Sequence, residues 1–177
     1  GNSIDVVLHC AGGGLGITTD IPTSEDLWKV FEINLGFAAE VNKIVIPMMK
    51  EKKSGKIIHI SSVNGTQSIS NVAYSTFKAA ISGYVRMLGN NLAKDSITVA
   101  GIIPGAFYAD ENAMARFQKI NPVDYKKFIE NKIPNKEIPL ASQYWPLIKF
   151  LAGREGHIMA GSLIAADAGQ STPFFIN

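Results

Sequence analysis

The sequence predicts an α/β protein in which helices pack on a parallel sheet. Short runs of apolar and β-branched residues alternate with longer segments of helical periodicity, and turns that contain Gly or Pro separate them. Strands that alternate with helices favour a parallel sheet with right-handed crossover connections. The expected strands lie at residues 4–8, 56–60, 96–103 and 162–166. We expect the first strand, a compact β-branched run, to be buried.

The first expected helix begins after Thr23, where Asp26 completes the pattern of an N-terminal capping box. It should run to about Glu51, and Pro47 should kink or break it. A second long helix is expected at about residues 73–93, because apolar side chains recur there on one helical face.

Residues 106–139 differ in character, since they combine several prolines with mixed charges and scattered aromatic side chains. We expect an irregular insertion with short helices there, followed by a helix at residues 144–152. The apolar tail at residues 173–177 is expected to dock on another surface. The whole of 1–177 is interpreted as one domain with an insertion at about 106–139.

The formal net charge of +2 is spread evenly, and no Lys/Arg cluster indicates a nucleic-acid or membrane surface. No apolar run is long enough to span a bilayer. Cys10 is the single cysteine, which fits a reducing compartment, and we expect a cytoplasmic protein. His9, His59 and His157 lie far apart in the sequence and nothing has metal-ligand spacing, so no metal site is predicted.

Tyr74 and Lys78 form the most informative pair in the sequence, with Ser62 upstream. A spacing of four places the phenol and the ammonium on one helical face. An unperturbed tyrosine has a pKa of about 10, and a fixed cation nearby lowers it by stabilising the phenolate. The pair therefore predicts a proton donor and acceptor for an alcohol or a carbonyl.

Each of these residues also has a purely structural explanation. A Tyr/Lys pair at this spacing occurs on ordinary helix surfaces, Ser62 can simply end a strand, and Asn34 can bond to nearby backbone. Ser61 and Ser62 are adjacent and should point to opposite faces of the strand, so only one of them can face the Tyr/Lys pair. The order of the motifs along the chain, more than any one of them, favours a functional interpretation.

Six motifs follow one another in a fixed order, and each lies after a strand or on the helix that follows. They are Cys10-Ala11-Gly12, Ile33-Asn34-Leu35-Gly36, Ser61-Ser62, Tyr74 with Lys78, Pro104-Gly105 and Asp167-Ala168-Gly169. Together they resemble the short-chain dehydrogenase/reductase family, over essentially the whole chain. The resemblance implies a Rossmann-like fold and an oxidoreductase that uses NAD or NADP.

The resemblance assigns a role to each matching position. Tyr74 corresponds to the catalytic acid/base, and Lys78 to the lysine that lowers the pKa of the tyrosine and holds the nicotinamide ribose. Ser62 corresponds to the serine that hydrogen-bonds the substrate oxygen, and Asn34 to the asparagine that anchors a water in the proton relay. The implied cofactor-binding residues are Ala11, Gly12, Tyr74, Lys78, Pro104, Gly105 and Ala106.

The implied reaction interconverts a small or medium-sized alcohol and its ketone, with the insertion at 106–139 recognising the substrate. Members of the family commonly form homotetramers or homodimers through the long helices and the last strand, and the tail residues Phe174, Phe175 and Ile176 are plausible interface elements. Two alternatives remain open: a non-catalytic binding or scaffold relative, and a member that performs dehydration or epimerisation with the same acid/base pair.

The sequence also departs from the family pattern. The dinucleotide fingerprint of the family lies on a glycine-rich turn after the family's first strand, and the resemblance places that turn before Gly1. Gly12-Gly13-Gly14-Leu15-Gly16 is not this fingerprint, because Ile17 stands where the last glycine is required. His9-Cys10 replaces the usual asparagines, and Ala168 replaces a glycine. The resemblance therefore implies that this chain is the C-terminal, catalytic half of the domain, whose first strand would present an unpaired edge.

Overall fold

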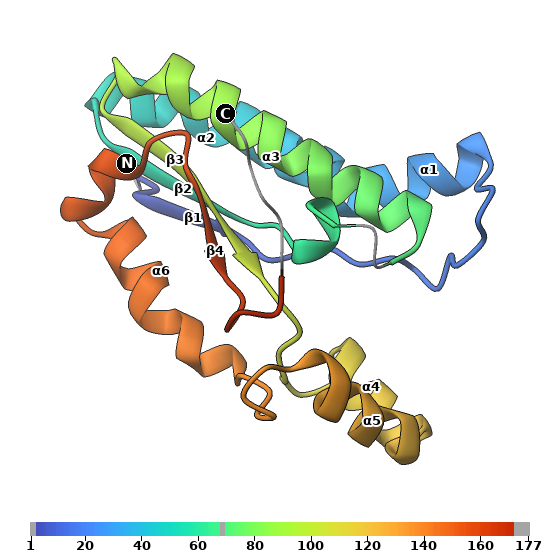
Figure 1. The fold of residues 1–177 in the computed structure, drawn as a ribbon. Helices are drawn as coiled ribbons and strands as arrows, with labels where there is room; N and C mark the ends of the chain where they lie inside the picture. The colour runs from blue at the N-terminus through green and yellow to red at the C-terminus, as the bar shows by residue number, and fades with distance from the viewer. Residues whose placement is uncertain (1–2, 68–69, 172–177) are drawn as a thin grey trace.

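A computed structural model describes residues 3–67 and 70–171. Its centre is a parallel sheet in the order β1 (Val6–His9), β2 (Gly55–Ile60), β3 (Ile97–Pro104) and β4 (Leu163–Ala166) (Figure 1). Each strand pairs in parallel with the next. The predicted α/β class and all four strand positions are confirmed.

Helices cover both faces of this sheet. On one face lie α1 (Ser24–Phe31), α2 (Phe37–Lys52) and α3 (Val72–Ala93), and on the other lies α6 (Trp145–Ala152) (Figure 1). Short helical turns complete the chain: η1 (Glu32–Gly36), η2 (Val63–Gly65), η3 (Ala141–Tyr144) and η4 (Glu155–Met159). The predicted long helix at 73–93 and the later helix at 144–152 are confirmed to within one residue.

The strands are apolar on both sides because each side meets a helix layer. Along β2, Ile57 faces the cluster of α2 and α3, whereas its neighbour Ile58 joins the cluster that contains Leu151 of α6. In β3, Val99 packs in the cluster of α2 and α3, and Ala100 packs in the cluster that contains Leu151. Such two-sided burial is typical of parallel sheets. Residues of these strands can therefore reach a functional site only beyond the carboxyl ends of the strands.

The burial of β1 differs from the prediction. The strand was predicted to be buried, but Val6 is 42% exposed and the rest of the strand is only half-buried. The reason is topological, since within residues 3–67 and 70–171 β1 has a single strand neighbour, β2, and so forms an edge of the sheet. The unpaired edge implied by the family resemblance is therefore present in this chain.

The helix after Thr23 starts as predicted, but it does not keep a regular α-helical form over its whole length. The capping box is confirmed: the Asp26 amide donates to Thr23 Oγ1 at 3.2 Å, and the Thr23 amide donates to Asp26 Oδ2 at 3.0 Å. The break expected at Pro47 is wrong, because α2 continues through this exposed proline to Lys52. The irregular stretch is instead the π-helical turn η1, and such turns are frequent at functional sites.

The insertion folds into α4 (Ala113–Ile120) and α5 (Pro122–Lys132), as the prediction of short helices required. Asn112 and Asn121 cap the two helices, and the ring of Phe117 packs edge-on against Tyr125 and Phe128. Figure 1 shows both helices beyond the carboxyl end of β3. The insertion therefore lies at the edge of the sheet where ligands of parallel sheets bind.

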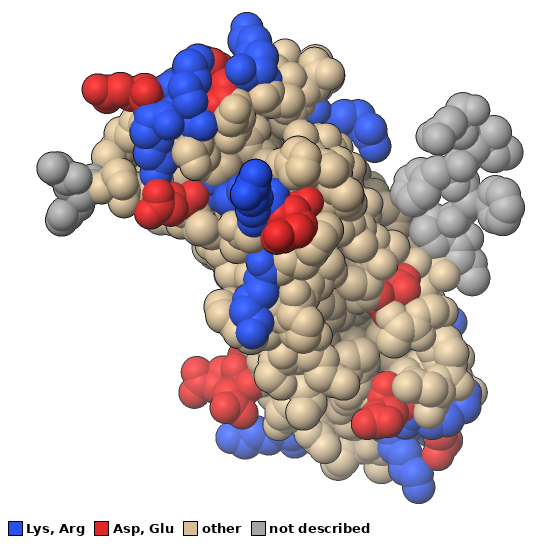
Figure 2. All heavy atoms as spheres, turned by 90° about the vertical axis from the view of Figure 1, so that its left-hand side faces the viewer, with Lys and Arg blue, Asp and Glu red and all other residues tan. Residues whose placement is uncertain are grey.

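Acidic and basic side chains are interspersed on the face shown in Figure 2, in keeping with the even charge of the sequence. Within the described part of the chain, no helix combines the length and apolar character that a bilayer crossing requires. The predicted docking of the tail at 173–177 lies outside the described residues.

A polar cluster is buried between the first two strands and the helices above them. The rings of His9 and His59 stack with centroids 4.5 Å apart. His9 Nε2 lies 2.9 Å from Asn42 Oδ1, and Asn42 Nδ2 donates to the Tyr84 hydroxyl at 3.1 Å. His59 Nε2 is buried without a hydrogen-bond partner. Both histidines are strand residues, His9 in β1 and His59 in β2.

Burial, with smaller contributions from the neighbouring His9 and Lys78, lowers the pKa of His59 to about 3. As the pH falls below the ordinary histidine pKa of about 6.5, this histidine binds a proton in the unfolded chain but stays neutral in the folded protein. The free energy of unfolding should then decrease by up to about 1.4 kcal/mol per pH unit for this group. Urea unfolding between pH 7 and pH 4.5 measures this slope.

The His59→Asn variant removes the titrating group while keeping a side chain of polar character. Its free energy of unfolding should depend less steeply on pH than that of the wild type over the same interval. Parallel curves for the two proteins would show that His59 does not carry the acid sensitivity.

Candidate active site

Tyr74 and Lys78 lie in the first turns of α3, at the end of the helix nearest the carboxyl ends of the strands. Asn71 caps this helix, and its Oδ1 accepts from the Tyr74 amide at 2.9 Å. Lys78 is buried, and its Nζ lies 5.5 Å from the centroid of the half-buried Tyr74 ring. The predicted sharing of one helical face is therefore present.

The two serines after β2 have different environments. Ser61 is buried and its hydroxyl donates to the Lys78 carbonyl at 2.9 Å, so it ties β2 to α3. Ser62 Oγ accepts from the Asn64 amide at 3.2 Å and also forms a hydrogen bond with the Tyr74 side chain. Of the two, Ser62 is thus the serine that the structure brings to the phenol.

Gly65 permits the close approach of η2 to α3. A Cβ atom at this position would lie 2.6 Å from the Lys78 carbonyl carbon and 2.7 Å from the Ala79 nitrogen. Real Cβ atoms do not come so near to backbone, so a larger residue would push η2 away from the helix. Because Ser62 caps η2, this contact holds the serine at Tyr74.

The loop after β1 closes over Lys78. Asn34, in η1, donates through Nδ2 to the carbonyls of Gly13 and Val30, both at 2.8 Å, and its Oδ1 accepts from the Gly13 amide at 3.1 Å. A Cβ atom at Gly12 would lie 2.7 Å from Asn34 Oδ1 and 3.2 Å from Lys78 Nζ. The structure therefore gathers Gly12, Asn34 and Lys78, while the water-anchoring role of Asn34 stays a prediction.

Burial dominates the electrostatics of the site. It raises the pKa of Tyr74, and the hydrogen bond from Ser62 opposes this by stabilising the phenolate. It lowers the pKa of Lys78 to about 8, against a small opposing effect of Cys10. The lowering of the tyrosine pKa that was expected from Lys78 is not among the effects on this phenol, whose pKa is raised by the loss of hydration.

Lys78 Nζ donates one hydrogen bond, at 3.0 Å, to the carbonyl of Ile60. A lysine ammonium has three donors, so this bond holds the amine in place without exhausting it. The remaining donors lie under Gly12 of the loop after β1, where the ribose of a nucleotide cofactor would be placed by the family pattern. The residues present therefore fit such a cofactor.

The segment after β3 is held by a residue that the sequence did not single out. Gln170 Oε1 accepts from the Ala106 amide at 2.7 Å, and Gln170 Nε2 donates to the Ala106 carbonyl at 3.0 Å. A Cβ atom at Gly105 would lie 2.6 Å from Gln170 Oε1. Asp167 fixes the loop that carries Gln170 by accepting from the amides of Gly169 and Ser171, each at 3.0 Å.

Pro104, Gly105 and Ala106 end β3 at the same edge of the sheet as Ser62. Of the three, Ala106 forms the hydrogen bonds with Gln170, which hold this segment as a second wall apart from the Tyr74–Lys78 cluster. Ala11 is exposed and lines a small hollow of about 80 Å³ beside β1. No sequence signal marked Gln170, because a glutamine after a strand has no motif of its own.

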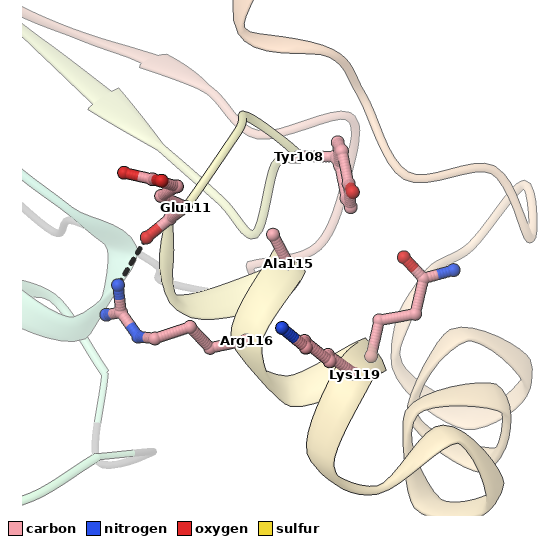
Figure 3. Close-up of a pocket in the computed structure, with 6 residues that line it drawn as sticks. Tyr108, Glu111, Ala115, Arg116 and Lys119 are labelled. Atoms are coloured by element: carbon pink, nitrogen blue, oxygen red, sulfur yellow. Dashed lines mark hydrogen bonds between the residues drawn. The ribbon is translucent and has the colours of Figure 1, made fainter.

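A larger hollow of about 620 Å³ opens beside the insertion (Figure 3). Its lining residues are Tyr108, Glu111, Ala115, Arg116, Gln118 and Lys119. Tyr108 follows Ala106 by two residues, so the hollow adjoins the segment that Gln170 holds. The carboxyl edge of the sheet thus presents an acid/base cluster, a clamped backbone segment and a charged hollow.

A parallel sheet with helices on both faces, and with a buried lysine beside a tyrosine and a serine at its carboxyl edge, is a Rossmann-like arrangement. The chain matches the family described as short chain dehydrogenase over residues 2–119. The match covers more than half of the chain, and the protein belongs to this family.

Individual relatives agree with the family match. The chain is 28% identical, over 94% of its length and 66% of the relative's, to 2-dehydro-3-deoxy-L-rhamnonate dehydrogenase (NAD(+)) of Sphingomonas sp. (strain SKA58). It is 30% identical, over 95% of its length and 67% of the relative's, to the 3-oxoacyl-[acyl-carrier-protein] reductase FabG of Buchnera aphidicola subsp. Schizaphis graminum. The chain therefore spans about two thirds of the length of these relatives.

Among solved structures, levodione reductase superposes with a TM-score of 0.84 at 25% identity. The superposition covers 95% of this chain and 67% of the reductase. The Rossmann-like arrangement predicted from the motifs is thus confirmed.

The Gln170 clamp makes a prediction for the Ala106 amide. Gln170→Ala removes both hydrogen bonds, so the Ala106 amide should exchange with solvent at least about tenfold faster, since each lost bond is worth about 1 kcal/mol. Gln170→Glu can still accept from the amide but cannot donate to the carbonyl, and should give an intermediate rate. Hydrogen exchange followed by NMR measures both, and unchanged protection in Gln170→Ala would refute the clamp.

Proposed function

We propose that the protein is an NAD- or NADP-dependent oxidoreductase that interconverts an alcohol and a ketone by hydride transfer. The observation that carries the proposal is the juxtaposition of Tyr74, Ser62 and buried Lys78 at the carboxyl edge of the sheet. Family membership supports it, as do relatives named as a dehydrogenase and a reductase. The chain spans about two thirds of these relatives, and the proposal concerns the protein as a whole.

The cofactor would be held by Ala11 and Gly12 at the adenosine side, by Lys78 at the ribose, and by the segment 104–106 at the nicotinamide. When bound, the nicotinamide supplies or accepts the hydride. Gln170 keeps the 104–106 backbone in one conformation, so the protein supplies a fixed wall against which the ring is oriented.

The side chains of the cluster then handle the substrate oxygen. During reduction, Ser62 donates a hydrogen bond to the carbonyl oxygen as negative charge develops there. Tyr74, whose raised pKa keeps it protonated at neutral pH, transfers its proton to that oxygen. Lys78 stabilises the phenolate that forms, and a water near Asn34 returns a proton from solvent. Oxidation of the alcohol runs through the same steps in reverse.

The substrate is a small or medium-sized alcohol or ketone recognised by the insertion at about 106–139. We also propose a homotetramer or homodimer in a cytoplasmic, reducing environment that suits the free Cys10. Exposed apolar side chains on the outer faces of the long helices support association: Phe37 (60% exposed), Ile44 (67%) and Met87 (60%). A monomer at micromolar concentration by light scattering would contradict it.

Replacing Tyr74 by Phe removes the proton donor while keeping the ring. We expect kcat for ketone reduction to fall by about 10²–10⁴-fold, with the far-UV circular dichroism unchanged. Tyr84→Phe is the matched control, because Tyr84 lies on the same helix but bonds to Asn42 away from the cluster, and it should retain turnover. Turnover that survives Tyr74→Phe would indicate that Tyr74, Ser62 and Lys78 have a structural and not a catalytic role.

The lowered pKa of Lys78, about 8, sets a pH limit for the reaction. The ammonium loses its proton as the pH rises through 8, whereas Tyr74, with a raised pKa, stays protonated. The kcat/KM for ketone reduction should therefore decline above about pH 8. Lys78→Arg retains its charge at high pH and should move this decline upward. A wild-type profile that stays flat to pH 9.5 would contradict the assignment of Lys78.

A further inference from the structure

The hollow beside α4 has a charged lining that the proposed chemistry does not use. Arg116 and Lys119 contribute two positive charges to it and Glu111 one negative charge, so the lining carries one net positive charge. Arginine and lysine three residues apart lie on the same side of a helix. Ala115, also in the lining, is small and leaves the space between Tyr108 and the two cations open (Figure 3).

The two cations remain available for a ligand. One guanidinium nitrogen of Arg116 donates a hydrogen bond to the backbone carbonyl of Glu111, which fixes the Arg116 side chain. The other N–H donors of the guanidinium take no part in that bond. The Glu111 carboxylate points away from Tyr108 and Lys119 (Figure 3). The acidic residue therefore anchors Arg116 through its backbone, and its carboxylate does not sit between the cations.

The helix that carries the cations is fixed to the segment proposed to face the nicotinamide. Asn112 caps α4 by accepting from the Ala115 amide at 2.9 Å, and its Nδ2 donates to the Phe107 carbonyl at 2.7 Å. Phe107 directly follows Ala106, whose peptide Gln170 holds. These hydrogen bonds thus hold the hollow and the segment proposed to face the nicotinamide in a fixed arrangement relative to each other.

We propose that Arg116 and Lys119 bind the carboxylate of the substrate, which makes the substrate an oxo acid or the corresponding hydroxy acid. This inference rests on the proposed alcohol–ketone chemistry and adds the substrate class to it. Arg116 and Lys119 both line the hollow, and a guanidinium and an ammonium each bind a carboxylate by charge-assisted hydrogen bonds. The single net positive charge matches a monoanion better than a phosphate dianion, and about 620 Å³ accommodates a carbon chain besides the carboxylate.

Levulinate and methyl levulinate test the proposal without requiring turnover, because they share a ketone and differ in the carboxylate. Calorimetric titration of the full chain should give a Kd at least tenfold lower for levulinate at low salt. Arg116→Gln and Lys119→Gln should each reduce this preference, and the double variant should abolish it. Glu111→Gln, which raises the net charge of the lining, should strengthen it.

Lys126→Gln is the matched control, since Lys126 is an exposed lysine of α5 outside the hollow, and it should keep the preference. Equal affinity for the acid and the ester, or a preference that survives in the double variant, would overturn the proposal. Inorganic phosphate that competes with levulinate more strongly than acetate does would also overturn it, in favour of a phosphate site.

Kinetics separate this inference from the proposed function. In the full-length protein with the cofactor, the double variant should raise KM for levulinate at least tenfold while leaving KM and kcat for methyl levulinate unchanged. Reduction of the ester without any preference for the acid would retain the proposed function and overturn the carboxylate site. Acid-selective binding without reduction of either compound would refute the proposed function and, with it, the assignment of the carboxylate to a substrate.

Discussion

The close seating of α3 on the end of β2 is the constraint on which the site depends. Gly65 lets η2 touch the helix backbone, Ser61 bonds to the Lys78 carbonyl, and the Lys78 amine bonds back to the Ile60 carbonyl. These contacts lock the serine that follows, the lysine and the preceding tyrosine into one arrangement. Without them, the same residues would be an ordinary strand end and an ordinary helix surface.

Burial at this junction has opposite effects on the two ionisable groups, and both effects suit proton transfer. The phenol of Tyr74 becomes a weaker acid and stays protonated, while Lys78 becomes a weaker base with a pKa of about 8. The buried His59 behind them stays neutral, with a pKa of about 3, and so adds no competing positive charge. Desolvation therefore sets the direction of both pKa shifts, and the Ser62 hydrogen bond at Tyr74 and Cys10 at Lys78 oppose it.

The sequence predicted the strands, the long helices and the Tyr74–Lys78 face because each follows from a local pattern of apolar periodicity or spacing. The capping box at Thr23 was predictable for the same reason. The π-helical turn around Asn34 and the uninterrupted passage through Pro47 were not, because tertiary packing decides them. Gln170 was missed since its partner, Ala106, lies 64 residues away in the chain. The raised pKa of Tyr74 likewise depends on burial, which spacing does not reveal.

The most direct test of the central claim is the transfer of deuterium from a cofactor labelled at the reactive carbon of the nicotinamide. The full-length protein, incubated with labelled NADH or NADPH and methyl levulinate, should yield an alcohol with one deuterium on the carbon that was the ketone. The Tyr74→Phe variant should yield almost none. Mass spectrometry that finds no labelled alcohol from wild-type protein with bound cofactor, for this and other small ketones, would contradict the account.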